Sequence, residues 1–274
     1  MRGFGLLRTR ANVLAEPHHG VPAKFQPAAA LARAGNFRHP HYLCDKALLE
    51  KHLIGATMTD QTQPLRIDIV SDVVCPWCIV GYSQLKQALE TTGTAHEIHW
   101  HPFELNPEMG PEGQNMGEHI TEKYGSTREQ SLANRAQLTN LGAGLGFDFN
   151  FTDEMRMHNT FNAHQLIHWA NMQDLGNALE QALFSAHFTH QRDLSDIDVL
   201  ADIATEVGLD ATEAKAVLED QRYAEDVRKI ESFWVQQGIR GVPAIVFDRK
   251  HLVTGAQGAE NYTSILKQLT GADA

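Results

Sequence analysis

Hydrophobic residues recur with regular spacing from residue 65 onward, and the period changes along the chain. Alternation of apolar and polar positions predicts a strand over 65–70, and helical spacing follows over 79–90. A second alternating stretch over 95–103 predicts another strand. The regular part of the chain is therefore expected to open with a β-α-β unit.

Helical spacing dominates from about residue 115 to 237, with an interruption expected at the glycine-rich segment 142–146. Asp210 with Glu213 has the spacing of a capping box at a helix start. Another helix, for which Ser195 is the expected N-cap, has an apolar stripe made of Ile197, Leu200, Ala201 and Ala204. These patterns predict a long block made of helices alone.

Strand character returns after the helical block. Residues 244–247 are apolar throughout, a turn is expected at 248–250, and 251–254 form the predicted hairpin partner. A last amphipathic helix has on one side Tyr262, Ile265, Leu266 and Leu269. The element order is β-α-β, helices, then β-β-α. It predicts an α/β fold in which a small mixed sheet, packed against helices, is split by an all-helical insertion.

The segment between the first predicted strand and helix reads Cys75-Pro76-Trp77-Cys78. Proline suits the first position of a helix, so both thiols are expected around a helix start. There the first sulfur faces unpaired backbone N–H groups and the positive end of the helix dipole, which favour its thiolate. The thiolate is the form that attacks disulfides. Cys-x-x-Cys in this strand-then-helix context indicates a thioredoxin-like redox pair.

Other interpretations of these residue types stay open. A zinc site would need Cys75, Cys78 and two distant histidines, because the chain has no second Cys-x-x-Cys or Cys-x-x-His. Two inert buried thiols are a further alternative. His99 and His101 share a predicted strand face and suggest a metal, but histidines in sheets are more often simply packed or solvated. We therefore expect no metal.

Composition and charge narrow the class of protein. The 274 residues have a net charge of −11, and no apolar run approaches the roughly eighteen residues that a membrane span requires. Residues 58–274 carry a net charge of −16, and such an acidic body disfavours nucleic acid as a partner. Only three cysteines occur, and Cys44 has no evident partner. The lack of a disulfide framework suits a reducing compartment, so we expect a cytoplasmic location.

Residues 1–57 differ from the rest of the chain. They carry a net charge of +5, four prolines and no sustained period, with a short helix conceivable only around 47–54. We expect a disordered N-terminal extension, and Met58 is a natural start just ahead of the first strand. The arginine-rich composition also resembles an organellar transit peptide faintly, whereas the continuous apolar core of a secretory signal is lacking.

Four segments carry a family resemblance: 72–78, 100–107, 241–244 and 255–257. Through them the chain resembles DsbA-like oxidoreductases of the thioredoxin superfamily, in their FrnE-like branch. That family also includes proteins similar to 2-hydroxychromene-2-carboxylate isomerase and kappa-class glutathione transferase. The resemblance spans about residues 64–270. It implies a thioredoxin-like core at 64–110 and 238–272, split by a helical insertion at 111–237.

The resemblance also implies roles for individual residues. Val242-Pro243 would be the cis-proline loop that faces the disulfide and offers the Val242 backbone to an extended client segment. His158 and Asn159, together with His164, match positions at which related proteins place pocket residues. A polar helix face is the simpler explanation for these three.

The sequence thus predicts a thiol–disulfide oxidoreductase that acts on protein or peptide disulfides. Cys75 would attack and Cys78 would resolve the mixed disulfide, with Pro76 and Trp77 tuning the pair. No bound cofactor is expected, and glutathione is a candidate co-substrate. The isomerase and transferase branches generally carry serine in place of Cys75. A glutathione-dependent isomerase or transferase acting on a small aromatic or polyketide-like substrate is the alternative, and a non-catalytic holdase or scaffold is a third possibility.

Overall fold

The computed structural model describes residues 26–27 and 63–271. Its main sheet is mixed, with β2 parallel to β3 and the other neighbouring strands antiparallel. In spatial order the strands are β1 (Gln26–Pro27), β7 (His251–Thr254), β6 (Ala244–Phe247), β2 (Leu65–Ser71) and β3 (His96–Pro102). The predicted mixed sheet is confirmed, and the two strands of the C-terminal hairpin have the predicted bounds.

Different helices cover the two faces of this sheet. On one face, α1 (Pro76–Thr92) and α9 (Ala259–Thr270) pack in a core that includes Ile67 and Ile69 of β2. On the other face, Trp234 of α8 (Ala224–Gln236) packs with Val70 and Val246. Strand alternation explains this division, because successive side chains of β2 point to opposite faces.

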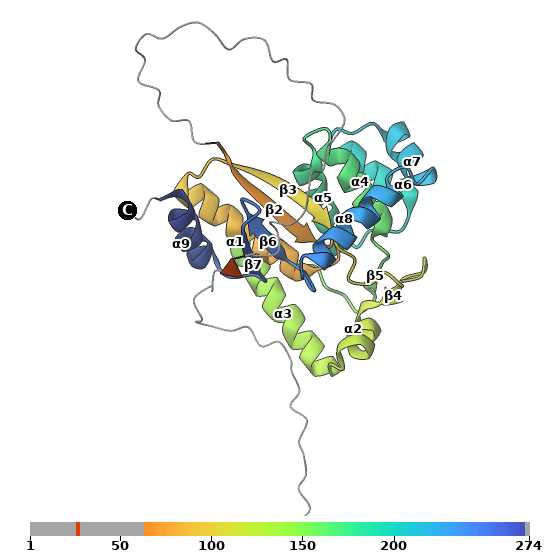
Figure 1. Ribbon diagram of the computed structural model, residues 1–274. Coiled ribbons are helices and arrows are strands. Elements are labelled where there is room, and N and C mark those ends of the chain that lie inside the picture. Colours follow the sequence, from red (N-terminus) through yellow and green to blue (C-terminus); the bar gives the residue numbers. More distant parts are fainter. Residues whose placement is uncertain (1–25, 28–62, 272–274) are drawn as a thin grey trace, which may run out of the picture.

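The insertion between β3 and β6 is mostly helical, as predicted. Figure 1 shows α4 to α8 gathered on the side of the sheet away from α9, while α2 and α3 form a separate arm. The helices that precede α8 are α2 (Met116–Tyr124), α3 (Arg128–Leu145), α4 (Phe161–Asn171), α5 (Gly176–Phe188), α6 (Ile197–Glu206) and α7 (Ala211–Glu219). The prediction that the insertion contains helices alone was wrong in one respect. β4 (Gln114–Asn115) and β5 (Arg156–Met157) pair as a small antiparallel sheet.

Helix ends differ from two sequence expectations. The N-cap of α6 is Asp196 rather than Ser195, because the Ser195 hydroxyl instead donates to Asp193 at 2.5 Å. The glycine-rich segment 142–146 was expected to interrupt the helical block. Instead, α3 continues through it to Leu145, and Gly146 caps the helix in the left-handed conformation. Glycine is favoured at such a helix end because it has no Cβ.

The predicted capping of α7 by Asp210 is confirmed, with one of the two bonds of a capping box present. The Asp210 side chain accepts a hydrogen bond from the Glu213 backbone N–H at 2.8 Å, which satisfies one of the unpaired donors of the first turn.

Of residues 1–57, the structure describes only Gln26 and Pro27, which pair with β7. No pattern in the sequence predicts this short strand. The expected disorder of the extension, the short helix around 47–54 and the start at Met58 lie outside the described residues.

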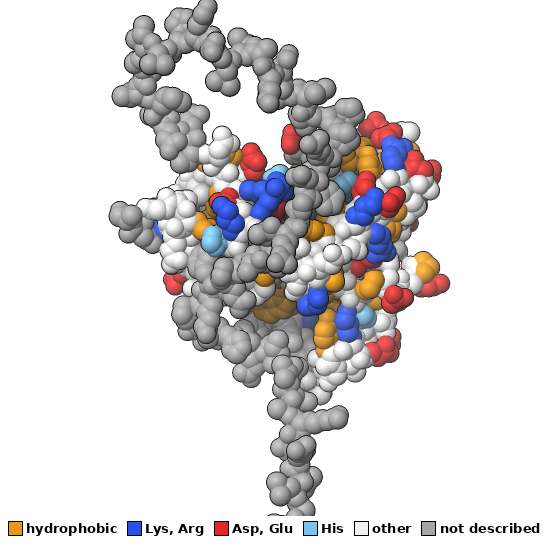
Figure 2. Space-filling model, viewed as in Figure 1, with side chains coloured by type: hydrophobic (Ala, Val, Ile, Leu, Met, Phe, Trp, Pro, Cys, Tyr) orange, Lys and Arg blue, Asp and Glu red, His pale blue; other side chains and the backbone are white. Residues whose placement is uncertain are grey.

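Charged side chains of both signs are intermixed on the face shown in Figure 2. On the side that carries α6 to α8, Lys and Arg lie beside Asp and Glu. Among residues 26–27 and 63–271, no helix is long and apolar enough to cross a membrane.

Candidate active site

The two cysteines of the motif lie at the N-terminal end of α1, as predicted. Cys75 is the N-cap residue and Pro76 begins the helix. The Cys75 backbone N–H donates to the Asp72 carbonyl at 2.9 Å, which closes the turn between β2 and α1. Both cysteines are free thiols; Cys75 is 5% exposed and Cys78 is 0% exposed. Cys75 is therefore the sulfur nearer to solvent.

The environment of Cys78 keeps its thiol protonated. Burial raises the pKa of this thiol well above its usual range, and the neighbouring Cys75 acts in the same direction. A hydrogen bond with the Ser71 side chain lowers it in part. Cys75 lies instead at the N-terminal end of α1, where the helix dipole is positive. The two thiols are thus chemically distinct.

The Val242–Pro243 peptide bond is cis, and this loop lies against Cys75. The Cys75 thiol donates to the Val242 carbonyl oxygen, with 3.8 Å between sulfur and oxygen. The Pro243 carbonyl accepts from the Gly255 backbone N–H at 2.8 Å, which ties the loop to the end of β7. A Cβ on Gly81 of α1 would lie 3.1 Å from Cγ of Pro243. Glycine at this position therefore permits the close approach of α1 to the loop.

Two exposed aromatic side chains lie near the cysteine pair. Trp77, inside the motif, and Tyr124, the last residue of α2, are among the exposed large apolar residues. Partial burial raises the pKa of the Tyr124 phenol, and negative charge at Cys75 adds to the effect. Lys123 donates to the Leu105 carbonyl at 2.6 Å and so holds the end of α2 beside the site. The sequence had no pattern that singled out Tyr124.

A cluster of buried polar side chains lies behind the cysteine pair. Its members are Ser71, Asp72, His164 and Glu180. Asp72 accepts from the Leu105 backbone N–H at 2.7 Å and lies 3.6 Å from Nε2 of His164. The Ser71 hydroxyl donates to Oε1 of Glu180 at 2.7 Å. Because β2 supplies Ser71 and the insertion supplies His164 and Glu180, core and insertion meet at this cluster.

The cluster holds two groups with shifted pKa values. Burial alone would lower the pKa of His164, but hydrogen bonding and charge attraction with Asp72 outweigh burial and raise it. Burial raises the pKa of Glu180 to about 7, although Ser71 and His164 oppose the shift. A carboxyl group that changes its charge near neutral pH therefore lies in this cluster, hydrogen-bonded to Ser71.

Glu180 is expected to make the protein less stable as the pH rises. Its ordinary pKa is 4.5, so the raised value in the folded state stabilises the protein fully below pH 4.5, and that stabilisation is lost as the pH rises through about 7. Each pKa unit corresponds to about 1.4 kcal/mol, so the whole effect is on the order of 3 kcal/mol. Glu180→Gln should remove this pH dependence. Urea unfolding at about pH 5 and pH 8.5 measures it, and an unchanged difference between the two pH values would contradict the raised pKa.

His158 and Asn159, the other residues assigned to substrate by resemblance, make contacts within the insertion and the loop before it. Nδ1 of His158 lies 2.9 Å from a carboxylate oxygen of Asp193. The Asn159 side chain donates to the Met109 carbonyl at 3.1 Å. Of the three pocket positions implied by the resemblance, His164 is the one that reaches the cluster behind the cysteines. A role of His158 and Asn159 in substrate binding stays a prediction.

Of the two strand histidines, His101 contacts a buried carboxylate, and His99 lies 3.2 Å from the Arg66 guanidinium. Nε2 of His101 lies 2.7 Å from Asp68, which also pairs with Arg66 at 2.6 Å. Burial would raise the pKa of Asp68, but His101 and Arg66 together lower it to about 2. In the part of the chain that the structure describes, no group of three or more His, Cys, Asp or Glu side chains is placed to hold a metal ion.

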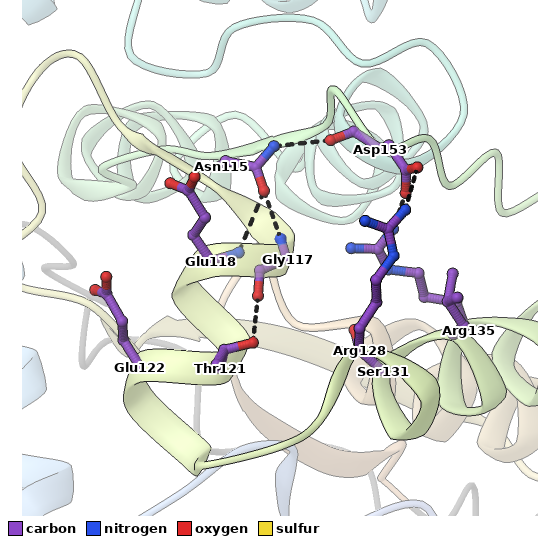
Figure 3. Close-up of a pocket in the computed structure, with 10 residues that line it drawn as sticks. Asn115, Gly117, Glu118, Thr121, Glu122, Arg128, Ser131, Arg135 and Asp153 are labelled. Atoms are coloured by element: carbon purple, nitrogen blue, oxygen red, sulfur yellow. Dashed lines mark hydrogen bonds and ion pairs between the residues drawn. The ribbon is translucent and has the colours of Figure 1, made fainter.

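An open pocket of about 470 Å³ lies apart from the cysteine pair, between α2, α3 and the loop before β5. Figure 3 shows Arg128 and Arg135 directed at Asp153 on one side and the Asn115 cap of α2 on the other. Nη2 of Arg128 lies 2.9 Å from Asp153, so these two charges of the pocket already have partners. Neither thiol lines the pocket.

Comparisons with known proteins agree with this geometry. A family model described as a DSBA-like thioredoxin domain matches residues 66–267. The crystal structure of a probable DsbA oxidoreductase from Streptomyces coelicolor matches with a TM-score of 0.71 and 36% identity, covering 76% of this chain and 90% of that one. The uncharacterized protein YwbO of Bacillus subtilis is 28% identical over 197 residues, which is 72% of this chain and 92% of YwbO.

A more distant structure shares the fold. The cytosolic disulfide reductase DsbM from Pseudomonas aeruginosa matches with a TM-score of 0.53 and 16% identity, covering 76% of this chain and 99% of that one. A second structure of DsbM contains GSH.

Proposed function

The chain belongs to the DSBA-like thioredoxin domain family, and from that premise we propose that it catalyses thiol–disulfide exchange on protein or peptide disulfides. The observation that supports this proposal most directly is the contact between Cys75, at the N-terminal end of α1, and the Val242 carbonyl in the loop before β6. A reactive sulfur beside the half-buried Val242 backbone can meet a client disulfide in an extended chain.

The two thiols have different roles in the proposed exchange. The Cys75 thiolate attacks a client disulfide, forms a mixed disulfide and releases one client thiolate. Cys78 then attacks Cys75, the bond between Cys75 and the client breaks, and the second client thiolate leaves. The burial of Cys78 supports this order, because a sulfur with 0% exposure does not meet a client directly. Pro76 and Trp77 lie between the two sulfurs in sequence and would tune the pair.

Glutathione is the proposed small-molecule co-substrate, and the cytoplasm is the proposed compartment. The GSH-bound structure of the cytosolic reductase DsbM supports both, as does the small number of cysteines in this chain. Retention of both Cys75 and Cys78 favours dithiol exchange over the isomerase and transferase chemistry of related branches.

A coupled assay tests this function. Reduction of insulin by glutathione, and disulfide formation in a reduced peptide, would be followed with the full chain and with its Cys75→Ser variant. The wild-type chain should accelerate at least one direction and the variant neither. Equal rates with both proteins would exclude exchange through Cys75.

Trp77 is expected to contribute to client binding. Trp77 is 37% exposed and follows Cys75 by two positions, and burying such an aromatic side chain against a client contributes on the order of 1–2 kcal/mol. Trp77→Ala should raise KM for a peptide disulfide by about 10-fold. Its rate with a small disulfide reagent should stay within about twofold of wild type.

Leu132→Ala is the matched control, because Leu132 is also exposed and apolar but lines the separate pocket. It should leave KM unchanged. If the two substitutions raise KM equally, Trp77 does not belong to the surface that binds the client.

A further inference from the structure

We propose that Gly81 is a positioning residue for client binding, because its lack of a side chain lets the Val242–Pro243 loop lie close to Cys75. The inference rests on the proposed exchange function and deepens it. Cys75 is the N-cap of α1, Gly81 is a buried residue of the same helix, and the loop contacts both residues. Gly81 therefore acts through Pro243 and Val242 rather than on the client directly.

The space beside Gly81 is filled by the loop and by the segment that follows β7. A Cβ on Gly81 would lie 3.1 Å from Cγ of Pro243 and 3.6 Å from Cα of Ala256. Two carbon atoms pack best at about 3.5–4.0 Å, so a methyl group at residue 81 would press on the Pro243 ring. The helix itself does not call for glycine, because Gly81 has no positive φ and alanine is the better helix former. The close approach is therefore what requires glycine here.

The segment that follows β7 is held in place from two sides. The Gly258 backbone N–H donates to Oε1 of Gln84, which belongs to α1, at 2.8 Å. The hydroxyl of Tyr262, a residue of α9 with 0% exposure, donates to the Gly255 carbonyl at 3.0 Å. These bonds fasten the segment to both helices, so it does not readily retreat from a side chain at residue 81.

The loop is fastened on its Pro243 side. The Pro243 carbonyl accepts from the Gly255 backbone N–H at 2.8 Å. On the other side, Gly241 is exposed, and a Cβ there would meet no atom within 4 Å. Pressure on the Pro243 ring should therefore displace Val242. The Val242 carbonyl oxygen lies 3.8 Å from the Cys75 sulfur, so a shift on the order of half an ångström would weaken this contact.

The expected consequence is selective for extended clients. A client segment that pairs with the Val242 backbone depends on the position of the loop, and a misplacement of about 1 Å can cost on the order of 10²-fold. A small disulfide reagent needs access to the Cys75 sulfur alone. The attack of Cys78 on Cys75 joins two residues at one helix start. Gly81 should therefore act on client binding and leave the chemistry of the two sulfurs unchanged.

Gly81→Ala in the full chain tests this inference. Exchange with a peptide disulfide, followed over a range of peptide concentrations with glutathione as reductant, gives KM and kcat. We expect KM to rise about 10-fold and kcat to stay within about twofold of wild type. The rate of the reduced chain with a small aromatic disulfide reagent should also stay within about twofold. The melting temperature should not fall, because alanine favours the helix.

Gly144→Ala is the matched control. Gly144 also lies within a helix, α3, but a Cβ there would meet no atom within 4 Å. This substitution should leave KM for the peptide and the rate with the small reagent unchanged. Gly81→Ser has the same Cβ and adds a hydroxyl group, so it should raise KM for the peptide at least as much as Gly81→Ala does.

Three results would overturn the role of Gly81. The first is a wild-type KM for the peptide in Gly81→Ala. The second is an equal loss toward the peptide and the small reagent, which would mean a general disturbance of the site. The third is the absence of a folding transition in Gly81→Ala, which would give Gly81 a role in the core rather than at the loop. If the wild-type chain itself does not exchange with the peptide, the proposed function fails, and this result is distinguishable because it involves no change at residue 81.

Discussion

Replacement of Cys75 by serine is expected to abolish exchange, whereas replacement of Cys78 should trap the enzyme on its client. Cys75 is the sulfur nearer to solvent and contacts the Val242 loop, so its loss removes the nucleophile. We expect Cys75→Ser to lower the exchange rate by on the order of 10³-fold or more. Cys78→Ser keeps the attacking sulfur but cannot resolve the mixed disulfide. Stable adducts of Cys75 with client should then appear on non-reducing gels and in mass spectra.

Cys44→Ser is the control for the loss of a thiol elsewhere in the chain. It should leave the exchange rate and the yield of adducts unchanged. If Cys75→Ser and Cys78→Ser behave alike, the assignment of separate roles to the two sulfurs is wrong.

Removal of Asp72 is expected to destabilise the protein by about 3–5 kcal/mol. Asp72 and His164 are both buried, and removing one partner of a buried ion pair leaves the other charge uncompensated. Asp72→Ala also leaves the Leu105 backbone N–H without its acceptor. Because the pKa of His164 is raised in the folded state, the stabilisation by its charge is present below pH 6.5 and is lost as the pH rises through the folded value. The loss in free energy of unfolding should therefore be largest at about pH 6.

An exposed ion pair provides the comparison for this prediction. Asp153 and Arg128 are both largely exposed, so Asp153→Ala should cost less than about 1 kcal/mol. Urea unfolding of both variants at about pH 6 measures the two losses in free energy of unfolding. Comparable losses for Asp72→Ala and Asp153→Ala would show that the buried cluster contributes little to stability.

Local patterns predicted the parts of the site that lie close together in sequence. Cys75, Pro76 and Cys78 could be placed at a helix start because a strand precedes them and proline favours the first turn. The strands at 244–247 and 251–254 were predictable because short apolar runs flank a polar turn. The contact of Val242 with Cys75 required the family resemblance, since nothing in the local pattern brings residues 167 positions apart together.

Long-range packing explains what the sequence did not reveal. Glu180 is a polar residue in a helix, which usually indicates a solvated face. It becomes buried because α5 packs against β3, and it bonds with Ser71 at the end of β2. Tyr124 joins the rim of the site through the position of the α2 end. At α6, neighbouring Ser195 and Asp196 are both good N-caps in sequence, and the bond from Ser195 to Asp193 decides between them.

The proposed chemistry is tested most directly by the redox equilibrium of the full chain. The protein would be brought to equilibrium with glutathione buffers of graded reduced-to-oxidised ratio, quenched, alkylated and analysed by mass spectrometry. We predict one reversible transition in which Cys75 and Cys78 together lose two hydrogens and become linked, with the same curve approached from either side. Two thiols that stay alkylated at every ratio, or a linkage that reduced glutathione does not reverse, would contradict a redox-active Cys75–Cys78 pair.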